Sequence, residues 1–327
     1  MSRPDEEAIA LLKKLIATPS TSRDESATAG IIRQWLADNG HTPARIDNNI
    51  YALAAPLRPE LPTVMLNSHH DTVKPSPAYT RDPYMPEEAD GRIYGLGSND
   101  AGASVVSLLA AFHLAEKGLI PSMVIVGEPT GLQAAVAERG LVVLDCIARG
   151  VSGHAARNEG VNAIYQAMTD IERLRTYSFP RVSDVLGPIK ISVTQIEAGR
   201  QHNVIPDECR FVVDVRTTDA YSNEETARML ADLIDSECAP RSTRVQASVI
   251  SPGHPLVAAA TDLGAATFVS PTTSDMSLLH GIPSLKIGPG RSERSHTADE
   301  YIMRHEITDA IDFYSSLISN LKNHLQE

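Results

Sequence analysis

The sequence predicts an α/β protein into which a second domain of ferredoxin-like order is inserted. Near both ends of the chain, stretches with helical spacing of apolar residues alternate with short apolar strands, as over residues 5–17 and 63–66. Residues 141–250 between them read as strand, helix, strand, strand, helix, strand, which is the ferredoxin-like two-layer order. We therefore expect an α/β domain made of residues 1–140 and 251–327, with residues 141–250 inserted into it.

The α/β part is predicted from apolar spacing and from glycine and proline breaks. Helices with four apolar positions facing one side should cover a sheet, and proline-rich loops should pass its rim. In chain order the expected elements are helices over 5–17 and 24–39, strands over 50–55 and 63–66, a loop over 75–90, a glycine-rich turn over 95–102, a helix over 103–117, a strand over 122–126, a helix over 254–263, a turn over 270–275, a strand over 283–287 and a last helix ending near 321.

The inserted part is predicted in the same way. Its expected elements are a strand over 141–148, a helix over 162–175, strands over 189–196 and 209–216, a helix over 223–238 and a strand over 243–250.

Length and charge restrict the class of protein. The chain has 327 residues, 42% of them hydrophobic and 21% charged, with a formal net charge of −12. That charge, without a basic run, argues against nucleic acid or an anionic membrane as the main partner and favours small molecules. No apolar stretch approaches the roughly 20 residues of a membrane helix, and the N-terminus leads into an amphipathic helix instead of a signal peptide, so we expect a cytoplasmic location.

The three cysteines are Cys146, Cys209 and Cys238. They are odd in number and lack the spacing of a metal site. We therefore expect reduced, structural thiols and no disulfide.

Polar side chains follow directly after the strand over 63–66, in the stretch Ser68-His69-His70-Asp71. In open α/β sheets, ligand sites gather at this end of the strands. We interpret His69 as a metal ligand and Asp71 as the carboxylate that orients it, while a buried structural histidine is the alternative. His70 should point away, because adjacent strand residues face opposite sides.

Two carboxylates and a second histidine are expected near the same edge. Asp100 stands at the entrance of the helix over 103–117, where it is either a helix cap or a metal-bridging group. Glu128 ends the strand over 122–126 and is either a ligand or a surface charge. Together with His69 and His296, these residue types suit zinc, cobalt or manganese.

Six short motifs occur in a fixed order: His69-x-Asp71, Gly-x-x-Asp100, Gly-Glu128-Pro-Thr, Ser-Gly-His154-Ala, Asn203-Val-Ile-Pro-Asp and His296-Thr-Ala-Asp-Glu. This order resembles the zinc-dependent deacylase and exopeptidase family, and the resemblance covers nearly the whole chain. The family contains acetylornithine deacetylase and succinyl-diaminopimelate desuccinylase. The resemblance is closest to its short acetylornithine deacetylase-like branch, which includes relatives acting on N-acetylcitrulline or N-succinylornithine.

The resemblance implies a zinc-exopeptidase-like catalytic domain with an inserted lid or dimerisation domain, and two metal positions. His69, Asp100 and Glu128 would form one complete site, with zinc as the metal and cobalt or manganese as alternatives. Asp100 would bridge to a second metal held by His296. Asp71 would fix the tautomer of His69.

The resemblance also implies how a substrate is held. His154, reaching from the inserted domain of a partner subunit in a homodimer, would stabilise the developing oxyanion. Asn203, Arg216, Gly288 and Gly290 would hold the carboxylate and amide of the substrate. From the residues alone, His154 could equally lie in an ordinary turn and Arg216 on a solvated sheet face.

One part of the family pattern is missing between Lys117 and Met123. The family has a strand there that ends in two adjacent glutamates, one the general base and the other a ligand of the second metal. Roughly thirty residues, enough for a strand and a helix, are absent, so the second site lacks a ligand. The segment is deleted from the gene, lost through a splice-like error, or present in the protein but missing from the recorded sequence.

By resemblance, the chain is a zinc-dependent amidohydrolase of arginine biosynthesis that removes an acetyl or succinyl group from an ornithine- or citrulline-type amino acid. The sequence does not distinguish these substrates, because pocket side chains set the difference. The alternative is a relative without the general base that has lost catalysis and retains metal or ligand binding. A serine hydrolase is disfavoured, because the Gly-x-Ser-x-Gly elbow is absent.

Overall fold

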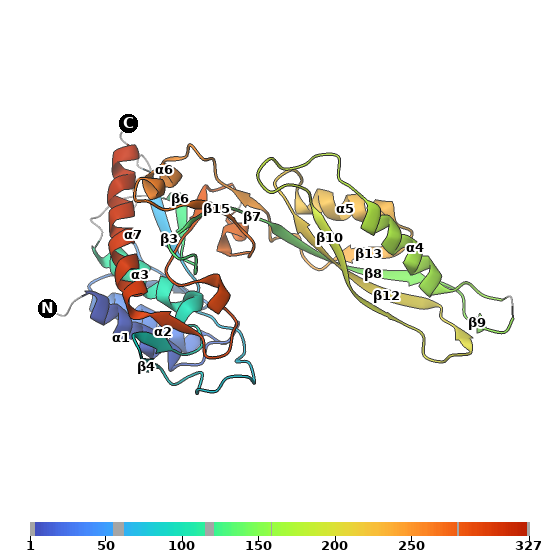
Figure 1. Cartoon of the computed structure of the whole chain (residues 1–327), viewed down its shortest axis with the longest axis horizontal. Helices are drawn as coiled ribbons and strands as arrows, with labels where there is room; N and C mark the ends of the chain where they lie inside the picture. The colour runs from blue at the N-terminus through green and yellow to red at the C-terminus, as the bar shows by residue number, and fades with distance from the viewer. Residues whose placement is uncertain (1–3, 55–61, 115–120, 158, 280, 326–327) are drawn as a thin grey trace. The chain divides into compact units, whose positions relative to one another are not determined.

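The computed structural model describes residues 4–54, 62–114, 121–157, 159–279 and 281–325 (Figure 1). The chain forms two compact units. Unit 1 comprises Met1–Val136, Ile250–Phe268 and Gly281–Glu327, and unit 2 comprises Ala137–Val249 and Val269–His280. The segment Val269–His280, which we expected in the first domain, therefore groups with the second unit.

Three parallel strands form the part of the unit 1 sheet that carries the polar motifs. These strands are β3 (Thr63–Asn67), β6 (Pro121–Val126) and β16 (Ser284–Lys286), in the order β16-β6-β3. They are short, and β3 and β6 are mainly apolar, as buried parallel strands are. Because parallel strands all end at one edge, the residues that follow them meet there.

Helices bury the remaining apolar surface of unit 1. They are α1 (Pro4–Ile16), α2 (Ser26–Asp38), α3 (Ala103–Leu114), α6 (Pro255–Thr261) and α7 (Arg304–His324). One core cluster joins α3, α6 and α7 to the sheet through Leu108, Leu256, Tyr314 and Ile125, and a second joins α1, α2 and α3 through Leu12 and its neighbours. Burying one such leucine contributes roughly 1.5–3 kcal/mol.

Smaller elements lie in unit 1, in unit 2 and at the boundaries between their segments. They are β1 (Ala44–Ile46), β2 (Asn49–Tyr51), β4 (Glu87–Ala89), β5 (Arg92–Tyr94), β7 (Ala134–Glu138), β14 (Ser248–Val249), β15 (Thr267–Ser270), β17 (Tyr301–Met303) and the short helical turns at Ser98–Gly102, Asp275–Leu278 and Ser292–Arg294. Within the described part of the chain, no helix is long and apolar enough to cross a bilayer.

Unit 2 contains a four-stranded antiparallel sheet with two helices on one face, as Figure 1 shows. The elements are β8 (Gly140–Arg149), α4 (Ala163–Thr176), β10 (Lys190–Ala198), β12 (Glu208–Thr217), α5 (Asn223–Leu233) and β13 (Glu237–Pro240), with sheet order β10-β12-β8-β13. The short strands β9 (Gly153–His154) and β11 (Val204–Ile205) pair with each other. The expected ferredoxin-like order is confirmed.

The fourth strand of this sheet differs from the prediction. We expected a helix to 238 and a strand over 243–250, whereas α5 ends at Leu233 and the strand is Glu237–Pro240. Ile234 is already in extended conformation and is buried in the core of unit 2, so the chain leaves the helix early to pack that side chain.

The expectation of three reduced thiols is wrong for Cys146 and Cys238. These two residues lie directly opposite each other on β8 and β13, with their Cα atoms 4.2 Å apart, and their sulfurs are bonded. Cys209 is buried and free. The sequence separation of 92 residues conceals this pairing, which depends on the strand register.

Thiol titration under denaturing, non-reducing conditions should therefore find one reactive thiol per chain, and three after reduction. The Cys209→Ser variant serves as the control and should show none before reduction. Three thiols in the unreduced protein would contradict the Cys146–Cys238 bond.

Candidate metal centre

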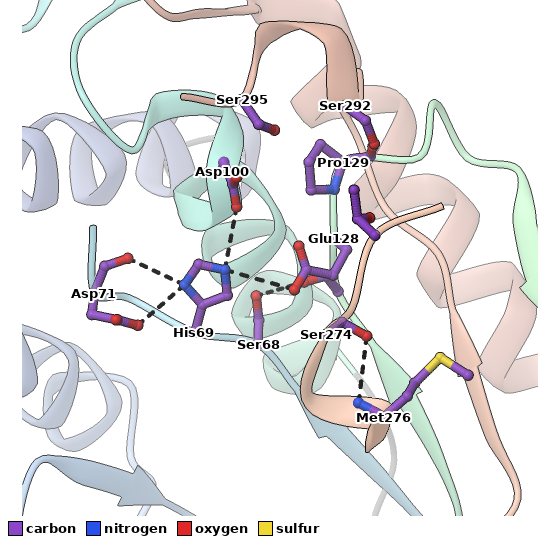
Figure 2. Close-up of polar contacts among 12 residues, drawn as sticks. Ser68, His69, Asp71, Asp100, Glu128, Pro129, Ser274, Met276, Ser292 and Ser295 are labelled. Carbon is purple, nitrogen blue, oxygen red and sulfur yellow. Dashed lines mark hydrogen bonds and ion pairs between the residues drawn. The ribbon is translucent and has the colours of Figure 1, made fainter. Parts of the chain in front are cut away.

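The centre begins where β3 and β6 end. Asn67 and Val126 are register partners at the ends of these parallel strands, and His69 and Glu128 each follow two residues later. The two side chains consequently leave the sheet next to each other, with 3.6 Å between His69 Nε2 and Glu128 Oε1. Figure 2 shows His69 with Asp71 on one side of its ring and with Asp100 and Glu128 on the other.

Asp100 completes a group of three ligands from the turn that precedes α3. Its Oδ1 lies 3.3 Å from His69 Nε2, and the ligand atoms of His69, Asp100 and Glu128 all lie within 4.8 Å of one another. Tetrahedral zinc with bonds of about 2.0–2.2 Å places its ligand atoms roughly 3.3–3.6 Å apart. The two measured separations from His69 therefore fit an ion between these side chains.

The other oxygen of Asp100 faces His296. Asp100 Oδ2 lies 3.5 Å from His296 Nε2, a separation that fits a second ion bridged by the same carboxylate. Among the described residues, no group of three ligands includes His296, whose side chain is 67% exposed. In the part of the chain that the structure describes, a second ion would therefore find two candidate ligands, Asp100 and His296.

Asp71 controls the orientation of the His69 ring. His69 Nδ1 lies 3.3 Å from Asp71 Oδ1 and 3.1 Å from the Asp71 carbonyl, and the Ser22 hydroxyl donates to Asp71 Oδ2. When the ring is neutral, these acceptors keep its proton on Nδ1, so that Nε2 can present its lone pair to a metal ion held with Asp100 and Glu128. His70 instead contacts Thr28 Oγ1 and the Asn48 carbonyl.

The surrounding carboxylates change the pKa of the central groups. Burial lowers the pKa of His69, but Asp100, Asp71 and Glu128 outweigh it, and the pKa lies well above its ordinary value. The hydrogen bond with His69 holds the pKa of Asp71 well below its usual range. For Asp100, burial raises the pKa, while His69, Ser295 and His296 lower it to a value below normal.

Two buried residues that the sequence reasoning missed join the loops carrying Asp100 and His296. The Glu300 carboxylate accepts hydrogen bonds from the backbone amides of Gly97, Asn99 and Asp100, at 3.1, 2.9 and 2.8 Å. The Asn99 side chain reaches the opposite way, to the backbone of Arg291 and to Ser295. In the sequence, the only sign of these roles is that Asn99 and Glu300 are polar residues within the predicted ligand motifs.

The residues expected to hold substrate lie in both units. His154 and Asn203 lie together in unit 2, where His154 pairs with Val204 and the Asn203 carbonyl accepts from Ala155. Arg216 is also in unit 2, and its guanidinium binds both oxygens of Asp214, at 2.8 and 3.1 Å.

Gly288 and Gly290 lie in unit 1 and permit close packing. A Cβ atom on Gly288 would stand 2.5 Å from the Glu128 carbonyl oxygen, and one on Gly290 would stand 2.2 Å from Asn99 Oδ1. The Gly288 amide donates to Thr130 Oγ1 and its carbonyl accepts from Thr130 and Leu132. A side chain at either position would therefore collide with a residue of the candidate centre or with its neighbour, which restricts both positions to glycine.

Comparisons with known proteins identify relatives of this chain. Residues 136–242 match the M20 peptidase dimerisation domain, which confirms the inserted dimerisation domain. Succinyl-diaminopimelate desuccinylase of Cereibacter sphaeroides (strain KD131) is 27% identical over 271 residues, covering 68% of this chain and 71% of that protein. Acetylornithine deacetylase of Edwardsiella ictaluri is 28% identical over 375 residues, covering 97% of each chain. Because 375 positions exceed the 327 residues here, this relative has segments that this chain lacks.

Solved structures show the same fold. An aminopeptidase PepT from Bacillus cereus has a TM-score of 0.74 at 16% identity, covering 97% of this chain and 99% of that one. The Bacillus subtilis YXEP protein, described as a dinuclear metal-binding peptidase from the M20 family, has a TM-score of 0.71 at 15% identity, covering 99% of each chain. The expected α/β fold with an inserted domain is confirmed.

We predict that Asp71→Asn weakens zinc binding by about 10- to 100-fold, because His69 loses the carboxylate that orients it. Calorimetric titration of the metal-free protein measures the effect. Asp47→Asn, an exposed change in the same unit, is the matched control and should leave the affinity unchanged. Equal affinities of wild type and Asp71→Asn would contradict the role of Asp71.

Zinc binding should also strengthen as the pH rises. In the metal-free protein, the carboxylates that raise the pKa of His69 stabilise the fold by binding the protonated ring. This stabilisation is complete at a pH below the ordinary pKa of histidine and is lost as the pH rises through the raised pKa. Metal binding requires the neutral ring, so it must release that proton. Calorimetry in buffers of different ionisation enthalpy, from about pH 6 to about pH 8, should detect proton release, and His69→Ala should reduce it.

Proposed function

We propose that this chain, an α/β protein of M20 metallopeptidase fold with an inserted M20 dimerisation domain, is a metal-dependent amidohydrolase acting on N-acyl amino acids. The carrying observation is the His69, Asp100 and Glu128 group, in which the two separations from His69 fit one tetrahedral ion. Zinc suits these ligands, and cobalt or manganese would also be accepted. His296 would hold a second ion with Asp100.

When bound, the metal supplies Lewis-acid polarisation of the scissile carbonyl and a water of lowered pKa. The residues of the chain prepare the site for it. Asp71 keeps the proton of His69 on Nδ1, and Asp100 and Glu128 provide the negative charge that a divalent cation requires. Glu300 holds the backbone around Asp100, so this carboxylate keeps its position when ligands exchange.

His154 is the proposed oxyanion donor, acting from a partner subunit. Its Nδ1 accepts a hydrogen bond from the Ala156 amide, so the neutral ring carries its proton on Nε2. That N–H is the donor which a developing oxyanion requires. The match to a dimerisation domain supports the homodimer on which this role depends.

Asn203, Arg216, Gly288 and Gly290 are the proposed contacts for the carboxylate and amide of the substrate. Arg216 presents a planar guanidinium suited to a carboxylate, although Asp214 must share it. The names of the relatives support an N-acetyl or N-succinyl substrate, and we propose an ornithine- or citrulline-type amino acid in arginine biosynthesis. The charge of −12 is consistent with our proposal of a cytoplasmic enzyme.

The second candidate is a relative that binds metal or ligand and has lost catalysis. In the described chain β3 pairs directly with β6, and the ligand group contains no second glutamate. The segment between Lys117 and Met123 partly falls on residues 115–120, outside the described residues. Loss of a general base lowers the rate by about 100- to 10,000-fold.

The test is hydrolysis of N-acetyl- and N-succinyl-ornithine and of the two corresponding citrullines by the zinc-loaded protein. We expect amino-acid release that a chelator abolishes and that His69→Ala lowers at least about 1,000-fold, since the ligand group is broken. Zinc binding without release from any of the four substrates would favour the non-catalytic candidate. A folded protein that binds none of zinc, cobalt and manganese would exclude the metal-dependent hydrolase and leave only ligand binding.

A further inference from the structure

Asn99 holds the backbone of one residue, Arg291, from both sides. Asn99 Oδ1 accepts a hydrogen bond from the Arg291 amide at 2.9 Å, and its Nδ2 donates to the Arg291 carbonyl at 3.1 Å. Asn99 is 0% exposed, so water does not compete for these bonds. Gly290 allows the contact, because any Cβ there would collide with Asn99 Oδ1. The structure therefore fixes where the Arg291 side chain starts.

The same contacts place Arg291 beside the metal ligands. Asn99 directly precedes Asp100 in the chain, and Arg291 also forms an antiparallel bridge with Thr130, two residues after Glu128. The hydroxyl of the next residue, Ser292, donates to the Pro129 carbonyl at 2.8 Å. Two of the three ligands of the centre are thus tied through their neighbours to the backbone at 291–292, and Figure 2 shows Ser292 next to Pro129.

The Arg291 side chain is exposed, and among the described residues it forms no ion pair or hydrogen bond. The nearby Arg294 differs, because it binds both oxygens of Glu306 and is 14% exposed. Arg216, the proposed clamp for the α-carboxylate, is already bound by Asp214. The backbone of Arg291 is therefore held beside the centre, and the donors of its exposed guanidinium are available to a ligand.

We propose that Arg291 binds a carboxylate on the acyl group of the substrate, and that this protein accordingly prefers N-succinyl-type over N-acetyl amino acids. A guanidinium binds a carboxylate through two parallel hydrogen bonds, and an acetyl group offers it no partner. This inference rests on the proposed amidohydrolase function. That function leaves open whether the acyl group is acetyl or succinyl, and the inference favours succinyl.

The experiment measures binding of the released acids, succinate and acetate, to the zinc-loaded protein by calorimetry. We expect wild type to bind succinate at least about 10-fold more tightly than acetate, because only succinate has a second carboxylate for Arg291. Arg291→Gln should weaken succinate binding by about 10- to 100-fold and leave acetate binding and zinc stoichiometry unchanged. Arg291→Lys should retain part of the succinate affinity, since lysine keeps the positive charge but cannot form the two parallel hydrogen bonds of a guanidinium.

Arg33→Gln is the matched control, because it removes an exposed arginine of α2 in the same unit. It should bind both acids as wild type does. Unchanged succinate binding in Arg291→Gln would overturn the proposal. So would an equal loss for succinate and acetate, which would assign Arg291 to a carboxylate common to both acids. A lower zinc stoichiometry in Arg291→Gln would show instead that Arg291 holds the loops that carry the metal ligands.

Failure of the proposed function is visible separately. Wild-type protein that binds succinate through Arg291 yet releases no amino acid from N-succinyl-ornithine would refute hydrolysis and retain the carboxylate site. Conversely, hydrolysis with equal kcat/KM for N-acetyl- and N-succinyl-ornithine would retain the enzyme and refute the role of Arg291.

Discussion

The parallel pairing of β3 with β6 is the constraint on which the candidate centre depends. With Asn67 opposite Val126, His69 and Glu128 emerge side by side from the same edge of the sheet. A shift of one residue in this register would turn one of the two side chains to the other face. The packing of the apolar core therefore determines the geometry of the polar site, although no residue of this core is a candidate ligand.

A second constraint joins the two loops that complete the centre. Glu300 holds the amides around Asp100, and Asn99 holds the backbone of Arg291, so each loop provides the buried group that positions the other. Buried polar groups of this kind are stable only when fully hydrogen-bonded, and both side chains meet that requirement. The arrangement places His296 against Asp100.

The charge balance of the centre follows from the same geometry. Three carboxylates lie around His69 in a chain of net charge −12, and they raise the pKa of its ring. A divalent cation bound at the proposed site would replace the proton that these carboxylates otherwise hold on the histidine, so we expect metal binding to depend on pH. Arg291 is an exposed cation whose backbone is held beside this negative region.

The sequence by itself determined the α/β class, the ferredoxin-like insertion and the motifs around His69, Asp100, Glu128 and His296, because apolar periodicity and strand-end motifs are local signals. It did not determine the Cys146–Cys238 bond, the short fourth strand of unit 2 or the roles of Asn99, Glu300 and Arg291. Each of these depends on which distant segments lie opposite one another. Strand register and loop contacts are set by packing over the whole chain, so only the tertiary structure decided them.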